Sequence, residues 1–207
     1  MDFQFDGGSA AQALGVLSSA IDAAPIESAL LRSAPGVELD AAIARALIAR
    51  AQEKGIAMLI ASSAGDAAKL GADGVHVLWS PDIGEAFKTQ RQAAPKSIVG
   101  ADAGRSRHDA MELGDAGADY VAFGIPPHVE DRAKAAERQR DLIVWWSELF
   151  EIPCVAFDVP DSEAAHQLAV AGADFVSVRV TSSEPGPDAA ARVREFSEAL
   201  RMPESAE

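Results

Sequence analysis

The chain has 207 residues, 48% of them hydrophobic, and its 32 acidic side chains outnumber the 18 basic ones to give a net charge of −14. This length can bury one sizeable core, so we expect a single domain over residues 1–207. The acidity makes nucleic acid and anionic membranes poor partners. The absence of a long apolar run and of a signal-peptide pattern at the N-terminus favours a cytoplasmic protein.

Strand and helix patterns alternate along the whole chain. Strands are expected at 26–31, 57–61, 74–78, 97–101, 120–125, 153–158 and 175–180, and helices at 9–22, 39–54, 64–70, 82–93, 106–116, 130–149, 161–171 and 187–201. Alternation of this kind predicts a parallel sheet with helices packed outside it. The strands are almost continuously apolar, which favours a (β/α)₈ barrel of the TIM type.

A (β/α)₈ barrel needs eight strands, and little sequence is available for the eighth. Only "DFQF" at 2–5 precedes the first helix, so the first strand is either short or missing. A missing strand would leave the edge of the second strand unpaired, and a homodimer could cover it. A doubly wound sheet is the rival fold, although no Gly-x-Gly-x-x-Gly follows an expected strand.

A short phrase occurs three times, as "LGADGVHVL" at 70–78, "AGADYVAFG" at 116–124 and "AGADFVSVR" at 171–179. Each copy follows a helical pattern and runs into an apolar segment. Repetition of this kind indicates one helix–turn–strand unit used three times. Gly71, Gly117 and Gly172 suit the left-handed position just past a helix end.

Reacting residues of such barrels lie at the carboxyl ends of the strands. His76, inside an apolar strand, is a candidate general acid or base, although it is also typical of a satisfied core histidine. Asp82 and Asp102 could together hold Mg²⁺, although Asp82 also suits a helix N-cap and Asp102 a turn. His128, after two prolines, is a weaker candidate that exposure alone could explain.

The segments "KLGADGVHV", "GADYVAFGIPP" and "AGADFVSV" resemble the thiamine-phosphate synthase family and its relative, the thiazole tautomerase. The resemblance runs from about residue 39 to 200 and implies a (β/α)₈ barrel. Its synthase members join hydroxymethylpyrimidine diphosphate to thiazole phosphate with Mg²⁺ and release pyrophosphate. By resemblance the ligand is a small phosphorylated heterocycle, the cofactor is Mg²⁺ and His76 matches the pocket histidine, whereas Asp102 stands where the family has a serine that meets pyrophosphate. The substrate- and phosphate-binding candidates are Arg32, Ser62, Arg179, Ser182 and Ser183.

Several reactive positions depart from the family pattern. Ala61 and Ser62 stand where the third strand would end in Asn-Asp, Asp82 comes one place late, and Asp158-Val159-Pro160 replaces a phosphate-binding Gly-Gly pair. Three functions therefore remain open. They are a thiamine-phosphate synthase, a metal-independent tautomerase-like isomerase that uses His76, and a non-catalytic barrel that binds a metabolite or a protein partner.

Overall fold

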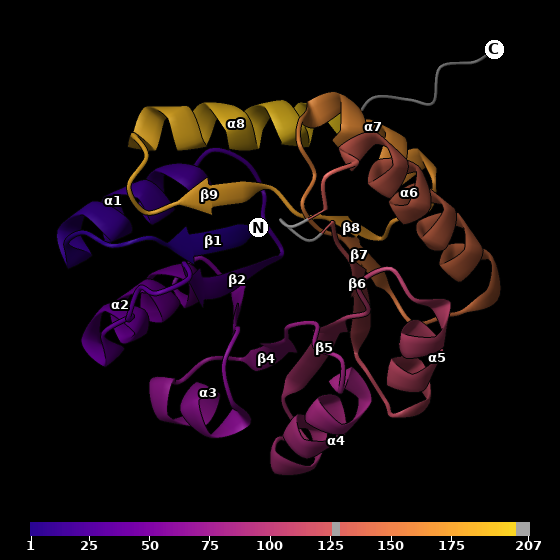
Figure 1. The fold of residues 1–207 in the computed structure, drawn as a ribbon. Helices are drawn as coiled ribbons and strands as arrows, with labels where there is room; N and C mark the ends of the chain where they lie inside the picture. Colours follow the sequence, from indigo (N-terminus) through magenta and orange to yellow (C-terminus); the bar gives the residue numbers. More distant parts are fainter. Residues whose placement is uncertain (126–128, 202–207) are drawn as a thin grey trace.

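The computed structural model describes residues 1–125 and 129–201, so His128 lies outside the described residues. Within them, parallel strands form an inner sheet and helices surround it (Figure 1). The strands are β1 (Asp2–Phe5), β2 (Ser28–Ser33), β3 (Ala57–Ile60), β4 (Gly74–Val77), β5 (Ile98–Asp102), β6 (Tyr120–Phe123), β7 (Cys154–Ala156), β8 (Phe175–Val176) and β9 (Arg179–Thr181). The helices are α1 (Ala10–Ile21), α2 (Ala41–Gln52), α3 (Ala64–Leu70), α4 (Ile83–Ala93), α5 (Arg107–Asp115), α6 (Arg132–Leu149), α7 (Ser162–Val170) and α8 (Gly186–Ala199).

The sheet closes on itself at its last strand. β8 and β9 are two segments of one stretch, separated by Ser177 and Val178, and they pair in parallel with β7 and with β1 respectively. The Asp2 amide donates to the Val178 carbonyl at 2.9 Å across this junction. The strands follow one another in chain order around the sheet, which confirms the predicted barrel and excludes the doubly wound alternative.

The first strand is present, and it is short. β1 pairs with β2 on one side, where Phe3 lies opposite Leu31, and with β9 on the other, where Phe3 lies opposite Val180. The alternative that this strand is missing is therefore wrong. The unpaired edge that would have favoured a homodimer does not exist, so the homodimer stays a prediction without that support.

The repeated Gly-Ala-Asp phrase has one structural role in all three copies. The glycines have φ of 78°, 85° and 103°, so each ends a helix in the left-handed conformation. A carboxylate oxygen of the following aspartate then accepts a backbone N–H from the preceding strand region: Asp73 from Met58 at 2.7 Å, Asp119 from Val99 at 2.7 Å and Asp174 from Cys154 at 2.8 Å. Each unit is thus fixed against the one before it.

Alternate residues of each strand face the helices or the barrel interior. The outward set, including Phe3, Leu31 and Met58, belongs to one continuous hydrophobic core with the helices. The inward set includes Asp2, Arg32, His76, Tyr120, Phe157 and Arg179, which contact one another across strands. Among the described helices none is long and apolar enough to cross a membrane.

Candidate functional site

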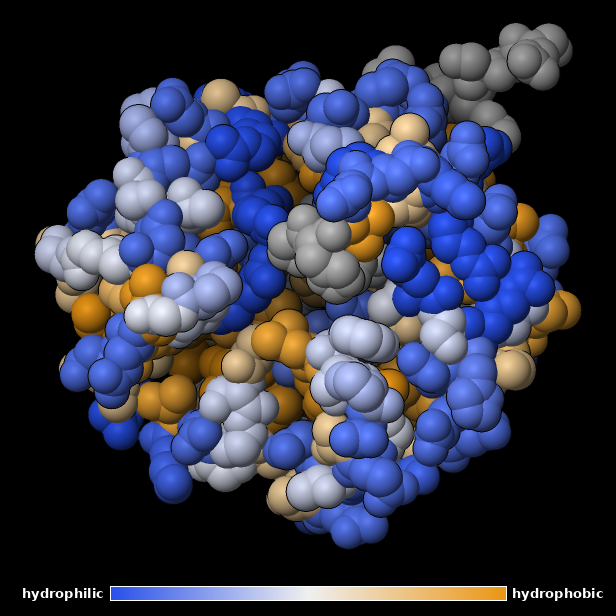
Figure 2. Space-filling view, viewed as in Figure 1, coloured by the Kyte–Doolittle hydropathy of each residue, from blue (hydrophilic) through white to orange (hydrophobic). Residues whose placement is uncertain are grey.

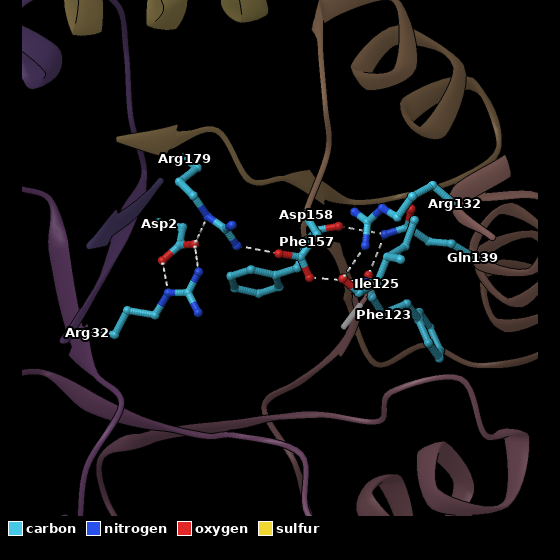
Figure 3. A network of polar contacts seen from close by, with 9 residues as sticks. All are labelled: Asp2, Arg32, Phe123, Ile125, Arg132, Gln139, Phe157, Asp158 and Arg179. Carbon is cyan, nitrogen blue, oxygen red and sulfur yellow. Dashed lines mark hydrogen bonds and ion pairs between the residues drawn. The ribbon is translucent and has the colours of Figure 1, made fainter. Parts of the chain in front are cut away.

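A chain of ion pairs crosses the barrel interior and reaches the carboxyl ends of β2 and β7 (Figure 3). Asp2 on β1 is 1% exposed, and its two carboxylate oxygens accept bonds from Nε and Nη2 of Arg32 on β2, both at 2.7 Å. Nε of Arg179 on β9 donates to the same carboxylate at 3.0 Å. Both predicted phosphate-binding arginines therefore reach the site, and one buried carboxylate neutralises part of their charge.

Asp158 adds a second carboxylate to this chain. It follows β7, and its φ of 56° makes it the one non-glycine residue with positive φ in the described part of the chain. One oxygen accepts from Arg179, and the other accepts the Ile125 N–H at 3.1 Å. A guanidinium and a backbone N–H are the donors expected around a bound phosphate. In this protein the Asp158 carboxylate itself accepts from both donors.

Asp102 lies beside Asp158, with Gly124 between them. An added Cβ at Gly124 would lie 2.8 Å from Oδ2 of Asp158 and 3.7 Å from Oδ2 of Asp102. Burial raises the pKa of Asp102 to about 6, the negative charge of Asp158 adds to this rise, and a hydrogen bond from the Gly104 N–H at 2.7 Å opposes it. The seventh and fifth strands therefore bring two carboxyl groups to one side of the mouth.

His76 is 3% exposed and points into the barrel from β4. Its Nδ1 is 2.7 Å from the Tyr120 hydroxyl, and its ring centroid lies 5.2 Å from that of Phe157. Burial lowers the pKa of His76 to about 4, with the Asp2 charge opposing this and the Arg32 charge adding to it. The imidazole is therefore neutral at pH 7. This geometry allows proton exchange with Tyr120, and it equally satisfies a core histidine.

The three predicted serines are held by carboxylates. Ser182 Oγ donates to Oδ1 of Asp6 at 2.7 Å, and Ser183 Oγ donates to Oδ2 of the same residue at 2.5 Å. Ser62 Oγ donates to Asp66 at 2.9 Å in the first turn of α3. The sequence correctly predicted these hydroxyls at strand ends. To donate to a phosphate, each hydroxyl would first have to break its hydrogen bond to a carboxylate.

A pocket of about 360 Å³ opens beside the mouth, between α2 and α3. Figure 2 shows hydrophobic residues in this hollow, at the lower left of the molecule. Arg32, Arg45 and Lys69 supply three basic side chains to its lining, against one acidic side chain, Asp66. Arg32 is paired with Asp2 and Lys69 lies 3.7 Å from Asp66, so the positive charge of the lining exceeds its negative charge by a small margin, and Ser62 also lines it.

The two predicted magnesium ligands, Asp82 and Asp102, are only partly assembled into a site. Asp82 is exposed at the N-cap position of α4, where its side chain makes no capping bond, whereas Asp102 is partly buried inside the mouth. The charges that act on Asp102 are those of Asp158 and Arg32. No group of three or more His, Cys, Asp or Glu side chains gathers in the ranges described. These side chains do not fit a preformed magnesium centre, and the two aspartates stay a prediction.

Three residues of the site were missed by sequence reasoning. Asp2 lay in the doubtful first strand, where its alternation with the apolar Phe3 and Phe5 could have marked it as facing inward. Tyr120 began a strand and was counted only as an apolar residue. Gln139 of α6 was hidden in a charged helix, yet its Nε2 donates to the carbonyls of Phe123 and Phe157 at 2.7 and 2.6 Å and supports the end of β7.

The model of the thiamine monophosphate synthase family matches residues 6–181. The chain belongs to that family. The thiamine-phosphate synthase of Rhodospirillum centenum is 36% identical over 194 residues, 89% of each chain, and that of Hyphomonas neptunium is 40% identical over 153 residues, 72% of this chain and 68% of the relative.

Solved structures agree with the barrel fold of the thiamine monophosphate synthase family. The thiamine phosphate pyrophosphorylase from Pyrococcus furiosus superimposes with a TM-score of 0.70 at 19% identity, covering 96% of this chain and 94% of the other. The 3-hexulose-6-phosphate synthase from Salmonella typhimurium gives 0.70 at 19% identity, covering 97% and 98%. At these identities the likeness concerns the fold. Membership of the family places the protein in thiamine biosynthesis. Its catalytic activity depends on the site residues of this chain.

Proposed function

We propose that this member of the thiamine monophosphate synthase family binds hydroxymethylpyrimidine diphosphate but does not join it to thiazole phosphate. The observation that carries the proposal is the Asp158 carboxylate, which accepts from Arg179 and from the Ile125 N–H. A second anion would have to displace this carboxylate and face Asp102 as well. The thiazole phosphate therefore lacks a place at the mouth.

Hydroxymethylpyrimidine diphosphate, the other substrate of the family reaction, has a suitable binding site. The pocket between α2 and α3 offers Arg32, Arg45 and Lys69, and its apolar wall includes Leu31 and Ile60. Charged guanidinium and ammonium groups are the usual partners of a diphosphate. An apolar wall next to them suits a flat pyrimidine ring.

The direct test combines binding and turnover. Calorimetry with hydroxymethylpyrimidine diphosphate should show saturable binding that Lys69→Ala weakens severalfold, whereas Lys54→Ala, which removes a partner of Asp22 outside the pocket, should not. Mixing both substrates with Mg²⁺ should give no thiamine phosphate beside a competent synthase. Turnover at the rate of that control would contradict the proposal, and so would failure to bind the diphosphate.

The metal-independent isomerase is a second candidate, favoured by the 2.7 Å contact between His76 Nδ1 and the Tyr120 hydroxyl. Its activity on a thiazole carboxylate phosphate would persist in EDTA and would fall in Tyr120→Phe. The cytoplasmic location and the homodimer expected from the sequence stay predictions.

A further inference from the structure

A second and larger cavity opens at the amino-terminal end of the barrel. Its volume is about 720 Å³, and its lining includes the first residues of four strands, Ser28, Ile98, Tyr120 and Phe175. In a parallel barrel these residues share the amino-terminal end, whereas Asp102 ends β5 and Asp158 follows β7. Neither of these aspartates lines the cavity, and Arg179, at the start of β9, does not line it either.

The cavity continues from the barrel interior to the space beneath α8. Leu30, Leu59, Val155 and Phe157 line it from the strands, and Phe196 and Leu200 line it from the last helix and its end. This path follows the interruption between β8 and β9, where the sheet lacks a regular strand.

Tyr120 separates this cavity from the mouth. Its ring lies over Gly100, where an added Cβ would be 2.1 Å from ring carbons, and its hydroxyl meets His76. The ring centroids of His76 and Phe157 lie 5.2 Å apart, which completes an aromatic layer across the interior. A ligand below this layer would not compete for the arginines above it.

One buried polar group in the cavity lacks a partner. Ser177 lies in the β8–β9 interruption, is 6% exposed and lines the cavity, and its Oγ makes no hydrogen bond within the described residues. A buried hydroxyl without a partner is unfavourable, and nearly all such groups in folded proteins are satisfied. A ligand with one hydrogen-bonding group would satisfy it.

The size and charge of the cavity define the ligand further. Its volume falls within the range of small-molecule sites, roughly 300–1,000 Å³. Two large hydrophobic side chains of its lining, Ile98 and Phe175, are 36% and 44% exposed without a ligand. Its ionisable lining groups are the side chains of Glu27, Asp119, Asp174 and Arg201 and the amine of Met1, whose pKa burial lowers to about 6, so acidic groups prevail at pH 7 and anions are disfavoured.

We propose that this amino-terminal cavity is a second ligand site, for an uncharged, largely apolar molecule of one or two rings whose single polar group hydrogen-bonds to Ser177. The proposal goes beyond the proposed function and does not rest on it.

The neutral probe N-phenyl-1-naphthylamine tests the site through its fluorescence on binding. The protein should bind one equivalent saturably. Val155→Trp, which fills the interior, should weaken the affinity at least tenfold, and Phe175→Arg, which places a charge at an exposed lining position, should do the same without altering the barrel wall. Leu149→Trp on α6, at a side chain that is 65% exposed and outside the cavity, is the matched control and should bind as the unaltered protein does.

Competition by two smaller probes tests the role of Ser177. In the unaltered protein 2-naphthol should displace the probe at a lower concentration than naphthalene does. The ratio of the naphthalene concentration to the 2-naphthol concentration should fall at least threefold in Ser177→Ala. Anionic 8-anilino-1-naphthalenesulfonate should bind at least tenfold more weakly than the neutral probe. Absence of saturable binding, equal binding by Phe175→Arg and Leu149→Trp, or an unchanged preference in Ser177→Ala would each overturn the proposal.

Discussion

Asp158 and Arg179 form an ion pair across the mouth of the barrel, and the same guanidinium also donates to Asp2 at 3.0 Å. Residues from β1, from the end of β7 and from β9, far apart in the sequence, are thereby tied together. The pair satisfies both charges within the protein, so any anionic ligand has to compete with it.

Replacing Asp158 by glycine should restore an anion site. Arg179 and the Ile125 N–H would lose their internal acceptor, and the positive φ of 56° would cost a glycine little. We expect the affinity for thiazole phosphate, measured by calorimetry, to rise at least tenfold. Asp158→Asn keeps the shape and tolerates this φ, so it isolates the effect of charge. An unchanged affinity in both variants would show that Asp158 is not what excludes the phosphate.

Asp2→Asn should lower the free energy of unfolding by about 2–4 kcal/mol, because it leaves two guanidiniums without their shared carboxylate. The figure lies towards the low end for buried pairs, since the Arg32 and Arg179 side chains are 24% and 40% exposed. Urea unfolding measures it. Asp22→Asn is the control, because the Asp22 side chain is 47% exposed and solvent screens its ion pairs, so its loss should lower the stability much less than Asp2→Asn does. Equal losses in the two variants would contradict the buried role of Asp2.

The pKa values of Asp102 and His76 predict opposing effects of pH on stability. Asp102 has a pKa of about 6 in the folded protein against 3.8 ordinarily, so the folded state holds its proton longer and stability falls as pH rises from about 4 to 6. His76 has a pKa of about 4 against 6.5, so the unfolded state holds more protons and stability rises over the same interval.

Each effect amounts to about 3 kcal/mol at full extent, from a shift of roughly two pKa units. The unaltered protein should therefore change little between pH 4 and 6. Asp102→Asn should become more stable as pH rises, and His76→Gln should become less stable. Urea midpoints at four pH values would show this divergence, and parallel curves for the two variants would contradict it.

Gly100→Ala should disturb the contact between Tyr120 and His76. The added Cβ would lie 2.1 Å from the Tyr120 ring, so the ring has to move and its hydroxyl leaves Nδ1. We expect a loss of about 2 kcal/mol or more in stability. Gly15→Ala in α1 meets no atom within 4 Å and should stabilise the protein by up to about 1 kcal/mol. An unchanged free energy of unfolding in Gly100→Ala would mean that the layer of Tyr120, His76 and Phe157 repacks without cost.

The fold could be predicted from the sequence because hydrophobic periodicity and the glycine stops report local structure. Every expected strand and helix is present, with ends shifted by a few residues, and Gly71 ends α3 as predicted. The break between β8 and β9 was not foreseen. Nothing local marks it, since "FVSVRV" has an ordinary strand pattern and the change of partner depends on β1 and β7.

The site was predicted less completely, because residue type identifies a candidate but not its partner. Arg32 and Arg179 were placed at the mouth, yet their binding to Asp2 depends on a strand whose existence was in doubt. Ser182 and Ser183 were assigned to a ligand, whereas Asp6, a loop residue about 176 positions earlier, holds them. Such pairings depend on barrel closure, which brings the two ends of the chain together.

The aspartates of the three Gly-Ala-Asp copies also bear on how the barrel sets its geometry. Asp73, Asp119 and Asp174 each accept a backbone N–H from the strand region before their own. The stagger between neighbouring strands, summed around the sheet, determines the shear and hence the width of a barrel. The units that lead into β4, β6 and β8 thus contain in their own sequence a polar group that fixes their offset from the preceding strand. The stagger at these three strand pairs is therefore specified locally.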